Sequence, residues 1–314
     1  MSFRPEDIPD QSGRIFLVTG ANTGLGFQTS KALLKKGATV IMSCRSLDKG
    51  KLAKESLLET NKSGTIHLLK LDLSDLNEIK KFSAEIKNRF GFLDVLINNA
   101  GIMAPPQTLS KQGLEIQFAV NHLSHMALTL ELLPLMSNIR GSRVVTVTSG
   151  AQYMGKIAWG NLQGEIKYDR WSSYSQSKLA NVMFAIELEK RLRANKSETF
   201  SLLAHPGLAK TNLQANSIMT SNSWVEALAY KLMSPLFQSA EFGALPQLIA
   251  ATRKKAKGGE QYVPRWNVKG LPRLAKVASS ALQSEDREKL WSISQSLIND
   301  YISIQNQLPI NPRT

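Results

Sequence analysis

The stretch Arg14-Ile-Phe-Leu-Val-Thr-Gly-Ala-Asn-Thr-Gly-Leu-Gly26 decides the fold. It begins with a short apolar run, which predicts a buried strand, and its glycines predict a tight turn. Apolar residues at helical spacing over 25–36 then predict a helix. Such a turn lets the backbone approach a pyrophosphate, whose charge is met by the positive end of the helix. A chance glycine-rich turn is the alternative, but a position between strand and helix favours a dinucleotide site.

The same alternation continues along the chain. Strands are predicted over 14–19, 38–43, 66–71, 94–97, 143–148, 199–203 and 258–263, and helices over 25–36, 47–58, 75–89, 114–133, 172–193 and 285–298. The strands have no alternating polar face, which is typical of a parallel sheet covered by helices on both faces. We therefore predict an α/β fold with a single Rossmann-type, doubly wound parallel sheet of about seven strands.

No linker rich in Pro, Gly or Ser interrupts the pattern, so residues 1–314 are predicted to form one domain. Residues 1–12 form an N-terminal extension and residues 265–314 a C-terminal extension. The pattern loosens over 208–240, where polar residues mix with large apolar ones. This segment is predicted to form short amphipathic helices that act as a substrate lid.

The composition is that of an ordinary globular protein, with 42% hydrophobic and 20% charged residues. Lys and Arg (39) exceed Asp and Glu (25) by 14, a surplus that attracts nucleic acid, an anionic membrane or a phosphorylated cofactor. The basic residues are dispersed and no aromatic residues alternate with them, so we expect no nucleic-acid partner. Peripheral contact with an anionic membrane stays open.

The sequence also gives expectations for cellular location, disulfides, metal binding and oligomeric state. The polar start lacks the layout of a secretory signal, and no window approaches the apolar length of a spanning helix, so a cytoplasmic location is expected. The single cysteine, Cys44, forbids an intrachain disulfide. The four histidines show no metal-ligand spacing, so no metal is expected. A monomer or homodimer is expected.

The spacing Thr-Gly-x-x-x-Gly-x-Gly over 19–26 resembles the short-chain dehydrogenase/reductase family. Further marks of that family follow in order over residues 13–265: Asp72-Leu73, Asn98-Asn99-Ala100-Gly101, Asn121, Ser149, Tyr174-x-x-x-Lys178 and Pro206-Gly207. The sequences of three segments (174–181, 205–207 and 161–163) look most like those of the retinol-dehydrogenase-like branch, which includes protochlorophyllide reductases. No cysteine follows Pro206-Gly207, which weakens the protochlorophyllide alternative.

The resemblance implies a set of residues that bind a nicotinamide dinucleotide. Asp72 is expected to contact the adenine, residues 98–101 to line the adenosine and brace the sheet, and Thr211 to meet the carboxamide. The full expected set is Gly20, Asn22, Thr23, Gly24, Leu25, Gly26, Arg45, Lys49, Asp72, Leu73, Asn98, Ala100, Gly101, Tyr174, Lys178, Pro206, Gly207 and Thr211.

The end of the second predicted strand favours NADP over NAD. NAD enzymes place an acid there for the ribose 2′-hydroxyl, but this chain has Ser43-Cys-Arg-Ser46 and no carboxylate before Asp48. Arg45 can clamp a 2′-phosphate bidentately, with Lys49 in support. The alternative is a surface arginine that caps the strand.

Four residues are predicted to carry the chemistry. Tyr174 and Lys178 are four apart in a predicted helix and share one face, so the ammonium can lower the pKa of the phenol, which then donates a proton to a carbonyl oxygen. Ser149 ends a strand at the ligand edge and would polarise that oxygen. Asn121 resembles the family's asparagine that holds a water in a proton relay. The alternatives are a solvated Tyr/Lys pair, a strand cap and a helix-kinking asparagine.

A longer insertion between Ser149 and Tyr174 contains Tyr153, Trp159 and Trp171, and together with the lid it predicts a roomy apolar pocket. We therefore expect an NADP-dependent enzyme acting on a lipophilic ketone, aldehyde or alcohol. The alternative is a non-catalytic NADP sensor or scaffold on the same fold. That alternative calls for a damaged catalytic set, and all four positions are intact.

Overall fold

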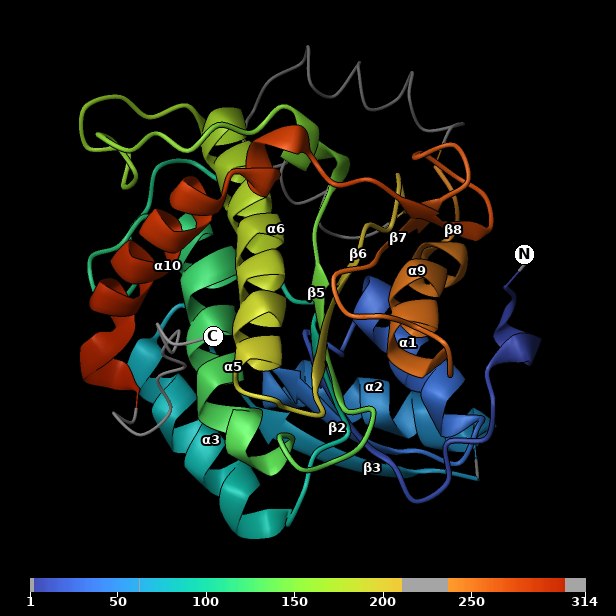
Figure 1. Ribbon diagram of the computed structural model, residues 1–314. Helices are drawn as coiled ribbons and strands as arrows, with labels where there is room; N and C mark the ends of the chain where they lie inside the picture. The colour runs from blue at the N-terminus through green and yellow to red at the C-terminus, as the bar shows by residue number, and fades with distance from the viewer. Residues whose placement is uncertain (1–2, 62, 211–236, 303–314) are drawn as a thin grey trace.

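A mostly parallel sheet of eight strands organises the chain in the computed structural model, which describes residues 3–61, 63–210 and 237–302 (Figure 1). The strand order is β3-β2-β1-β4-β5-β6-β7-β8, and only β8 runs antiparallel to its neighbour. The strands are β1 (Ile15–Thr19), β2 (Thr39–Cys44), β3 (Thr65–Lys70), β4 (Val95–Asn98), β5 (Arg143–Val147), β6 (Phe200–Ala204), β7 (Gln261–Pro264) and β8 (Pro272–Ala275). The predicted fold class is confirmed, with one strand more than expected.

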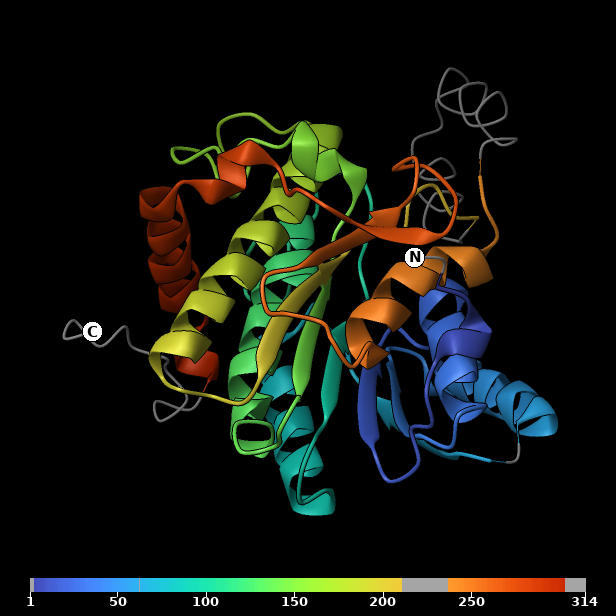
Figure 2. The same cartoon turned by 45° about the vertical axis from the view of Figure 1, so that its right-hand side comes forward.

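Helices cover both faces of the sheet, because successive side chains of each buried strand point to opposite faces. In β1, Leu17 joins one apolar core while Phe16 and Val18 join the other. Helices α3 (Leu76–Arg89), α5 (Ser124–Leu132) and α6 (Arg170–Ala194) pack on the first face, and α1 (Gly24–Leu34), α2 (Leu47–Thr60) and α9 (Ala240–Thr252) on the second (Figures 1 and 2). The reversal of strand order between β1 and β4 leaves a ligand crevice at their carboxyl ends.

The predicted helix over 114–133 is three elements. A short α4 (Ile116–Phe118) leads into a π-helical turn, η2 (Ala119–Leu123), and then into α5. Single π-helical turns often mark functional sites. This one contains Asn121, and periodicity alone could not reveal it because every residue of the turn is buried.

Two elements were not predicted. Helix α9 is buried on nearly all sides and contains Gly243 and Pro246, so its sequence shows neither amphipathic period nor unbroken helix propensity. Strand β8 has four residues, is half exposed and begins with a proline, as edge strands can. The shorter helical elements are η1 (Pro5–Asp7), η3 (Leu133–Leu135), η4 (Gly150–Tyr153), η6 (Ser279–Leu282) and η7 (Asn299–Tyr301).

The extensions pack against the sheet layers. In the N-terminal extension, Phe3 and Ile8 join the core beside α1 and α9. In the C-terminal extension, α10 (Ser284–Ile298) lies along α6, where Trp291 stacks on Phe184 and lies under the Arg191 guanidinium. Most of the predicted lid, residues 211–236, lies outside the described residues.

Candidate functional site

A cavity of about 1030 Å³ opens at the carboxyl ends of β1, β4, β5 and β6. Most of the site residues predicted from the sequence line it: Gly20, Asn22, Thr23, Gly24, Leu25, Arg45, Asp72, Leu73, Ala100, Gly101, Ser149, Tyr174, Lys178, Pro206 and Gly207. Four predicted residues do not line it: Gly26, Lys49, Asn98 and Asn121. Thr211 lies outside the described residues. The fold therefore brings together residues that are up to 187 positions apart, from Gly20 to Gly207.

The glycine turn fits the diphosphate of a dinucleotide. Gly20 and Gly24 have φ values of +65° and +54°, which side chains other than glycine rarely adopt. A Cβ on Gly26 would collide with the carbonyl oxygen of Gly20, so this glycine permits close packing rather than direct contact with the cavity. Thr23 is the extended N-cap residue of α1 and its side chain forms no capping hydrogen bond, so it leaves the N–H groups at the start of the helix free to bind an anion.

Thr19 and Asn99 brace this turn; Thr19 was not predicted as a site residue, and Asn99 was predicted only as part of the segment 98–101. The backbone N–H groups of Asn99 and Ala100 both donate to Thr19 Oγ1 at 2.9 Å, and Asn99 Nδ2 donates to the Thr19 carbonyl at 2.7 Å. Asn98 instead donates to Thr129 Oγ1 on α5, away from the cavity. Because neighbouring residues at a strand end point to opposite faces, Asn99 and not Asn98 reaches the cavity.

At the adenosine end, Arg45 lines the cavity directly after β2. Ser46 caps α2 and accepts the N–H of Lys49, whose side chain does not line the cavity. Asp72 Oδ1 accepts two hydrogen bonds from Ser74, from the N–H at 2.9 Å and from the hydroxyl at 2.7 Å, so one carboxylate oxygen is already committed.

Tyr174 and Lys178 lie one turn apart on α6, and each is 5% exposed. Lys178 Nζ is 5.7 Å from the centre of the Tyr174 ring. Ser149, just after β5, lies close enough to the Tyr174 hydroxyl to lower its pKa, and its own Oγ accepts the N–H of Ala151. The hydroxyl of the neighbouring Thr148 donates to the Lys178 carbonyl at 2.9 Å. Within the described residues, no atom accepts a hydrogen bond from Lys178 Nζ, although this side chain is buried against the cavity.

Asn121 lies behind this group on the π-helical turn and is fully buried. Its Oδ1 accepts the Ile102 N–H at 2.8 Å, and its Nδ2 donates to the Ile102 carbonyl and to Ser177 Oγ. A Cβ on Gly101 would lie 3.0 Å from Asn121 Oδ1 and 3.4 Å from Lys178 Nζ, so Gly101 separates the asparagine and the lysine by one backbone unit.

Burial dominates the protonation of the pair. It raises the pKa of Tyr174 to about 12, which the neighbouring Ser149 side chain only partly offsets, and it lowers the pKa of Lys178 to about 8. We expected the ammonium to lower the tyrosine pKa, but the desolvation of the phenolate is the larger effect here. At neutral pH the phenol therefore keeps its proton and can act as a donor.

The other end of the cavity is apolar. It is lined by Ile102, Met103, Pro105, Ile116, Val120, Met154, Trp171, Leu208 and Phe237. Of the three aromatic residues expected here, only Trp171 lines the cavity. The Tyr153 hydroxyl donates to the Lys276 carbonyl, and Trp159 packs under the Lys289 ammonium. Long-range packing put these two rings against the C-terminal extension.

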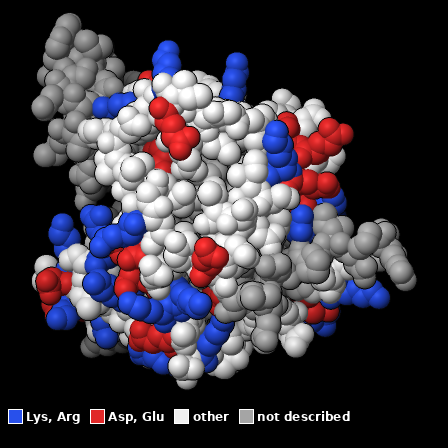
Figure 3. Space-filling view, turned by 90° about the vertical axis from the view of Figure 1, so that its left-hand side faces the viewer, with Lys and Arg blue, Asp and Glu red and all other residues white. Residues whose placement is uncertain are grey.

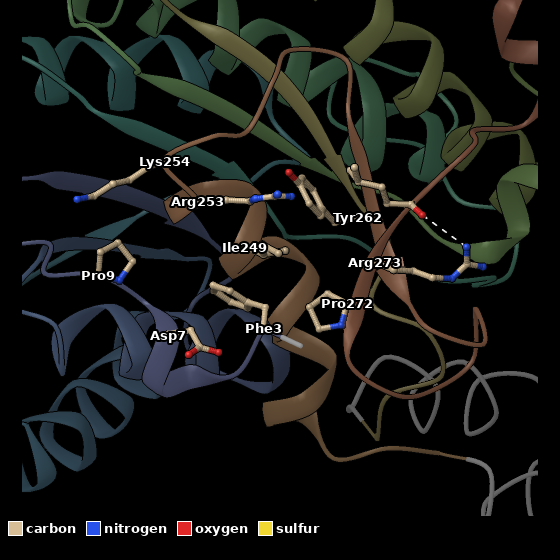
Figure 4. A pocket seen from close by; sticks show the side chains of 10 residues that line it. Phe3, Asp7, Pro9, Ile249, Arg253, Lys254, Tyr262, Pro272 and Arg273 are labelled. Atoms are coloured by element: carbon tan, nitrogen blue, oxygen red, sulfur yellow. Dashed lines mark hydrogen bonds between the residues drawn. The ribbon is translucent and has the colours of Figure 1, made fainter. Parts of the chain in front are cut away.

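A second cavity, of about 520 Å³, lies between the N-terminal extension, α9 and the β7–β8 edge (Figure 4). Its walls are mainly apolar, and three cationic side chains, Arg253, Lys254 and Arg273, border it. They extend in different directions, and Arg273 Nε donates to the Arg265 carbonyl. Because these charges do not converge, this cavity offers no group of residues that could act together.

The described residues contain neither a metal site nor a membrane-spanning helix. Within residues 3–61, 63–210 and 237–302, no group of three His, Cys, Asp or Glu could hold a metal ion. In the same part of the chain, no helix has the length and hydropathy to cross a membrane.

The chain belongs to the short-chain dehydrogenase family, whose model matches residues 14–222. These proteins are oxidoreductases that use a nicotinamide cofactor, and this chain is an oxidoreductase for CH–OH and C=O groups in the retinol-dehydrogenase-like branch.

Three proteins illustrate what this chain is similar to. Human retinol dehydrogenase 12 is 35% identical over 286 residues, which cover 91% of this chain and 86% of that protein. Mouse polyprenol dehydrogenase is 34% identical over 296 residues, with coverages of 92% and 85%. A crystal structure of a protein of unknown function from Mycobacterium paratuberculosis is 35% identical, with a TM-score of 0.79 and coverages of 95% and 98%. The predicted family and branch are confirmed.

The buried ammonium gives a testable consequence for stability. Because the pKa of Lys178 falls from 10.5 to about 8 on folding, the folded protein at pH 7 carries the full cost of the buried charge, about 3 kcal/mol. We expect Lys178→Met to raise the thermal unfolding midpoint of the cofactor-free protein at pH 7. The gain should shrink between pH 8 and 10.5, where the folded wild type releases the proton. Lys190→Met, at a half-exposed ion pair with Glu288, is the control and should give no gain; a similar gain in both variants contradicts the assignment.

Proposed function

We propose that this protein is an NADP-dependent oxidoreductase that interconverts a lipophilic carbonyl compound and its alcohol. The observation that carries the proposal is the convergence of Ser149, Tyr174 and Lys178 on one wall of a cavity that also contains the glycine turn. A bound nicotinamide would supply or accept the hydride at that wall. No observation favours the non-catalytic alternative.

The protein's own part in the reaction is proton transfer and charge stabilisation. The Tyr174 hydroxyl, protonated at neutral pH, donates its proton to the substrate oxygen during reduction. The Ser149 hydroxyl holds that oxygen as it gains negative charge. The Lys178 ammonium stabilises the resulting phenolate, and the apolar walls keep water out. Asn121 holds the backbone at Ile102, which forms part of the same wall.

The preference for NADP is supported by Arg45 and by the missing acid. Arg45 lines the cavity where an NAD enzyme would have a carboxylate for the ribose hydroxyls. Its guanidinium matches a 2′-phosphate in charge and geometry. Lys49 does not reach the cavity, so we now assign the clamp to Arg45 alone.

The substrate class is supported by the apolar end of the cavity. Among the described lining residues, the charged side chains are Arg45, Asp72 and Lys178, and none of the residues at the apolar end is charged. Two relatives are named for retinol and polyprenol, which are long apolar alcohols, and the apolar end of the cavity suits such a substrate.

The first test of the chemistry is Tyr174→Phe. With NADPH and a panel of hydrophobic aldehydes, ketones and quinones, we expect turnover to fall by about 10²- to 10⁴-fold because the proton donor is lost, with NADPH affinity retained. Tyr153→Phe is the matched control, since its hydroxyl bonds outside the cavity, to Lys276. Unchanged turnover in Tyr174→Phe would refute the role of Tyr174.

The cofactor preference is tested by Arg45→Ala. Loss of a charge-assisted clamp should raise KM for NADPH by roughly 10- to 100-fold and leave KM for NADH almost unchanged. Lys49→Ala should change neither value. Equal losses with the two cofactors would mean that Arg45 does not read the 2′-phosphate.

We also propose peripheral contact with an anionic membrane beside the cavity mouth, for an enzyme acting in the cytoplasm. Met154, which lines the cavity, is 76% exposed, and Ile166, on the loop before α6, is 81% exposed. The exposed residues near them include Lys156 and Lys167 and also the acids Glu165 and Asp169. On the face over α10 and α3, cations also alternate with carboxylates, as in the Lys190–Glu288 pair (Figure 3).

The membrane proposal is tested by co-sedimentation with vesicles of phosphatidylcholine and phosphatidylserine. We expect binding at low salt that is lost as ionic strength rises, because lysines near an anionic surface contribute about 1 kcal/mol each. Ile166→Asp should reduce binding. Leu282→Asp, at another exposed apolar residue that lies on η6, should not. If the wild type does not sediment with the vesicles, the membrane proposal is wrong and the excess of basic residues serves solubility only.

A further inference from the structure

His125 is a buried histidine that the proposed chemistry does not use. It lies on the first turn of α5, four residues after Asn121, and is 1% exposed. Its Nδ1 lies 3.1 Å from the Asn121 carbonyl oxygen, and its Nε2 lies 3.0 Å from Thr19 Oγ1. The ring therefore joins the π-helical turn to the end of β1, just before the glycine turn.

The partners fix the tautomer. A carbonyl oxygen only accepts, so Nδ1 carries the hydrogen and donates it to Asn121. Burial lowers the pKa of His125 to about 4, so the ring is neutral and its Nε2 accepts the hydrogen of the Thr19 hydroxyl. The two lone pairs of that hydroxyl accept the N–H groups of Asn99 and Ala100. Every polar atom of the connection is satisfied in this arrangement.

These bonds close a ring around the segment Asn99–Ile102. Thr19 holds the start of the segment through Asn99 and Ala100, and the Asn121 side chain holds its end through both backbone groups of Ile102. His125 links the two residues that hold the segment. The ring thus runs from Thr19 through the segment to Asn121 and returns to Thr19 through His125.

The segment inside the ring is the part of the cavity wall that faces Lys178. Ala100, Gly101 and Ile102 line the cavity, and Gly101 lies against Lys178 Nζ. If the link through His125 were missing, the π-helical turn and the glycine turn could move relative to each other, and this wall would move with them. Small displacements of this kind are costly in catalysis, since about 1 Å can lower a rate by roughly 100-fold.

We propose that His125 is a positioning residue that holds the Asn99–Ile102 wall, and with it the nicotinamide end of a bound cofactor, in register with Lys178. This inference rests on the proposed function for its turnover readout. His122 provides the contrast on the same stretch of helix: its Nε2 contacts Ser294 Oγ on α10 at 2.9 Å, so it ties the turn to the C-terminal extension and not to the cavity.

Two conservative variants separate the two bonds of His125. In His125→Asn, the amide nitrogen can take the place of Nδ1 and donate to Asn121, but Thr19 loses its acceptor. In His125→Gln, the amide oxygen can take the place of Nε2 and accept from Thr19, but Asn121 loses its donor. His125→Leu removes both bonds. Ser294→Ala is the control, because it removes one buried hydrogen bond to a histidine without touching the ring.

The measurements are kcat, the Kd of NADPH, the emission of the bound nicotinamide and the thermal midpoint. We expect His125→Leu to lower kcat by roughly 10- to 100-fold while the Kd of NADPH stays within about threefold, because the phosphate-binding residues are not in the ring. The emission of bound NADPH should shift, and the Asn and Gln variants should each recover part of kcat. Ser294→Ala should lower the midpoint without changing kcat or emission.

The inference would be overturned if the Asn and Gln variants had the same kcat and the same NADPH emission as the wild type. This test remains decisive if His125→Leu fails to fold. A loss of kcat that only follows the loss of thermal stability, as measured on Ser294→Ala, would overturn it too. If the wild type binds NADPH but reduces no carbonyl compound, the proposed function has failed, and the emission of bound NADPH still decides whether His125 positions the nicotinamide.

Discussion

A buried ammonium group is the constraint on which the site depends. Lys178 is almost completely removed from bulk water, and none of the described residues accepts a hydrogen bond from its Nζ. The aromatic face of Tyr174, 5.7 Å away, compensates only part of the lost hydration. A folded protein retains such a group where something else completes its surroundings, and a ribose hydroxyl or a transient phenolate would do so. The cost of the charge is thus a property of the free protein that a ligand would relieve.

The rest of the fold holds this lysine in place from three sides. Thr148, at the end of β5, donates to the Lys178 carbonyl, which fixes α6 against the sheet. Ser177, the residue before Lys178, accepts from Asn121 and donates to the Tyr174 carbonyl. On the outer side, α10 packs along α6 through the stacked rings of Trp291 and Phe184. The C-terminal extension therefore supports α6 although it contributes no residue to the described cavity wall.

The features that depend on local periodicity and turn residues could be predicted from the sequence. The glycine turn, seven of the eight strands and α6 follow from local periodicity and turn chemistry, and 15 of the predicted site residues line the cavity. Three features depend on tertiary packing and could not be read locally. The π-helical turn is buried throughout, α9 has no amphipathic period, and the bracing by Thr19 and His125 joins residues 106 positions apart. The segment 98–101 was predicted as a whole, and only Asn98 points away from the cavity, because β4 ends at Asn98, one residue later than expected.

The two ends of the cavity differ in how they achieve recognition. At the end with the glycine turn, backbone N–H groups, positive φ values and Arg45 line the cavity, and the family marks found there are short in sequence. At the apolar end, single side chains from several loops form the wall, and within the described chain they offer shape rather than charge. An apolar wall distinguishes substrates that differ by one methylene by only about 1–3 kcal/mol. Under the proposed function, selection at this end would depend on the length and shape of the substrate, while the position of its oxygen would depend on Ser149 and Tyr174.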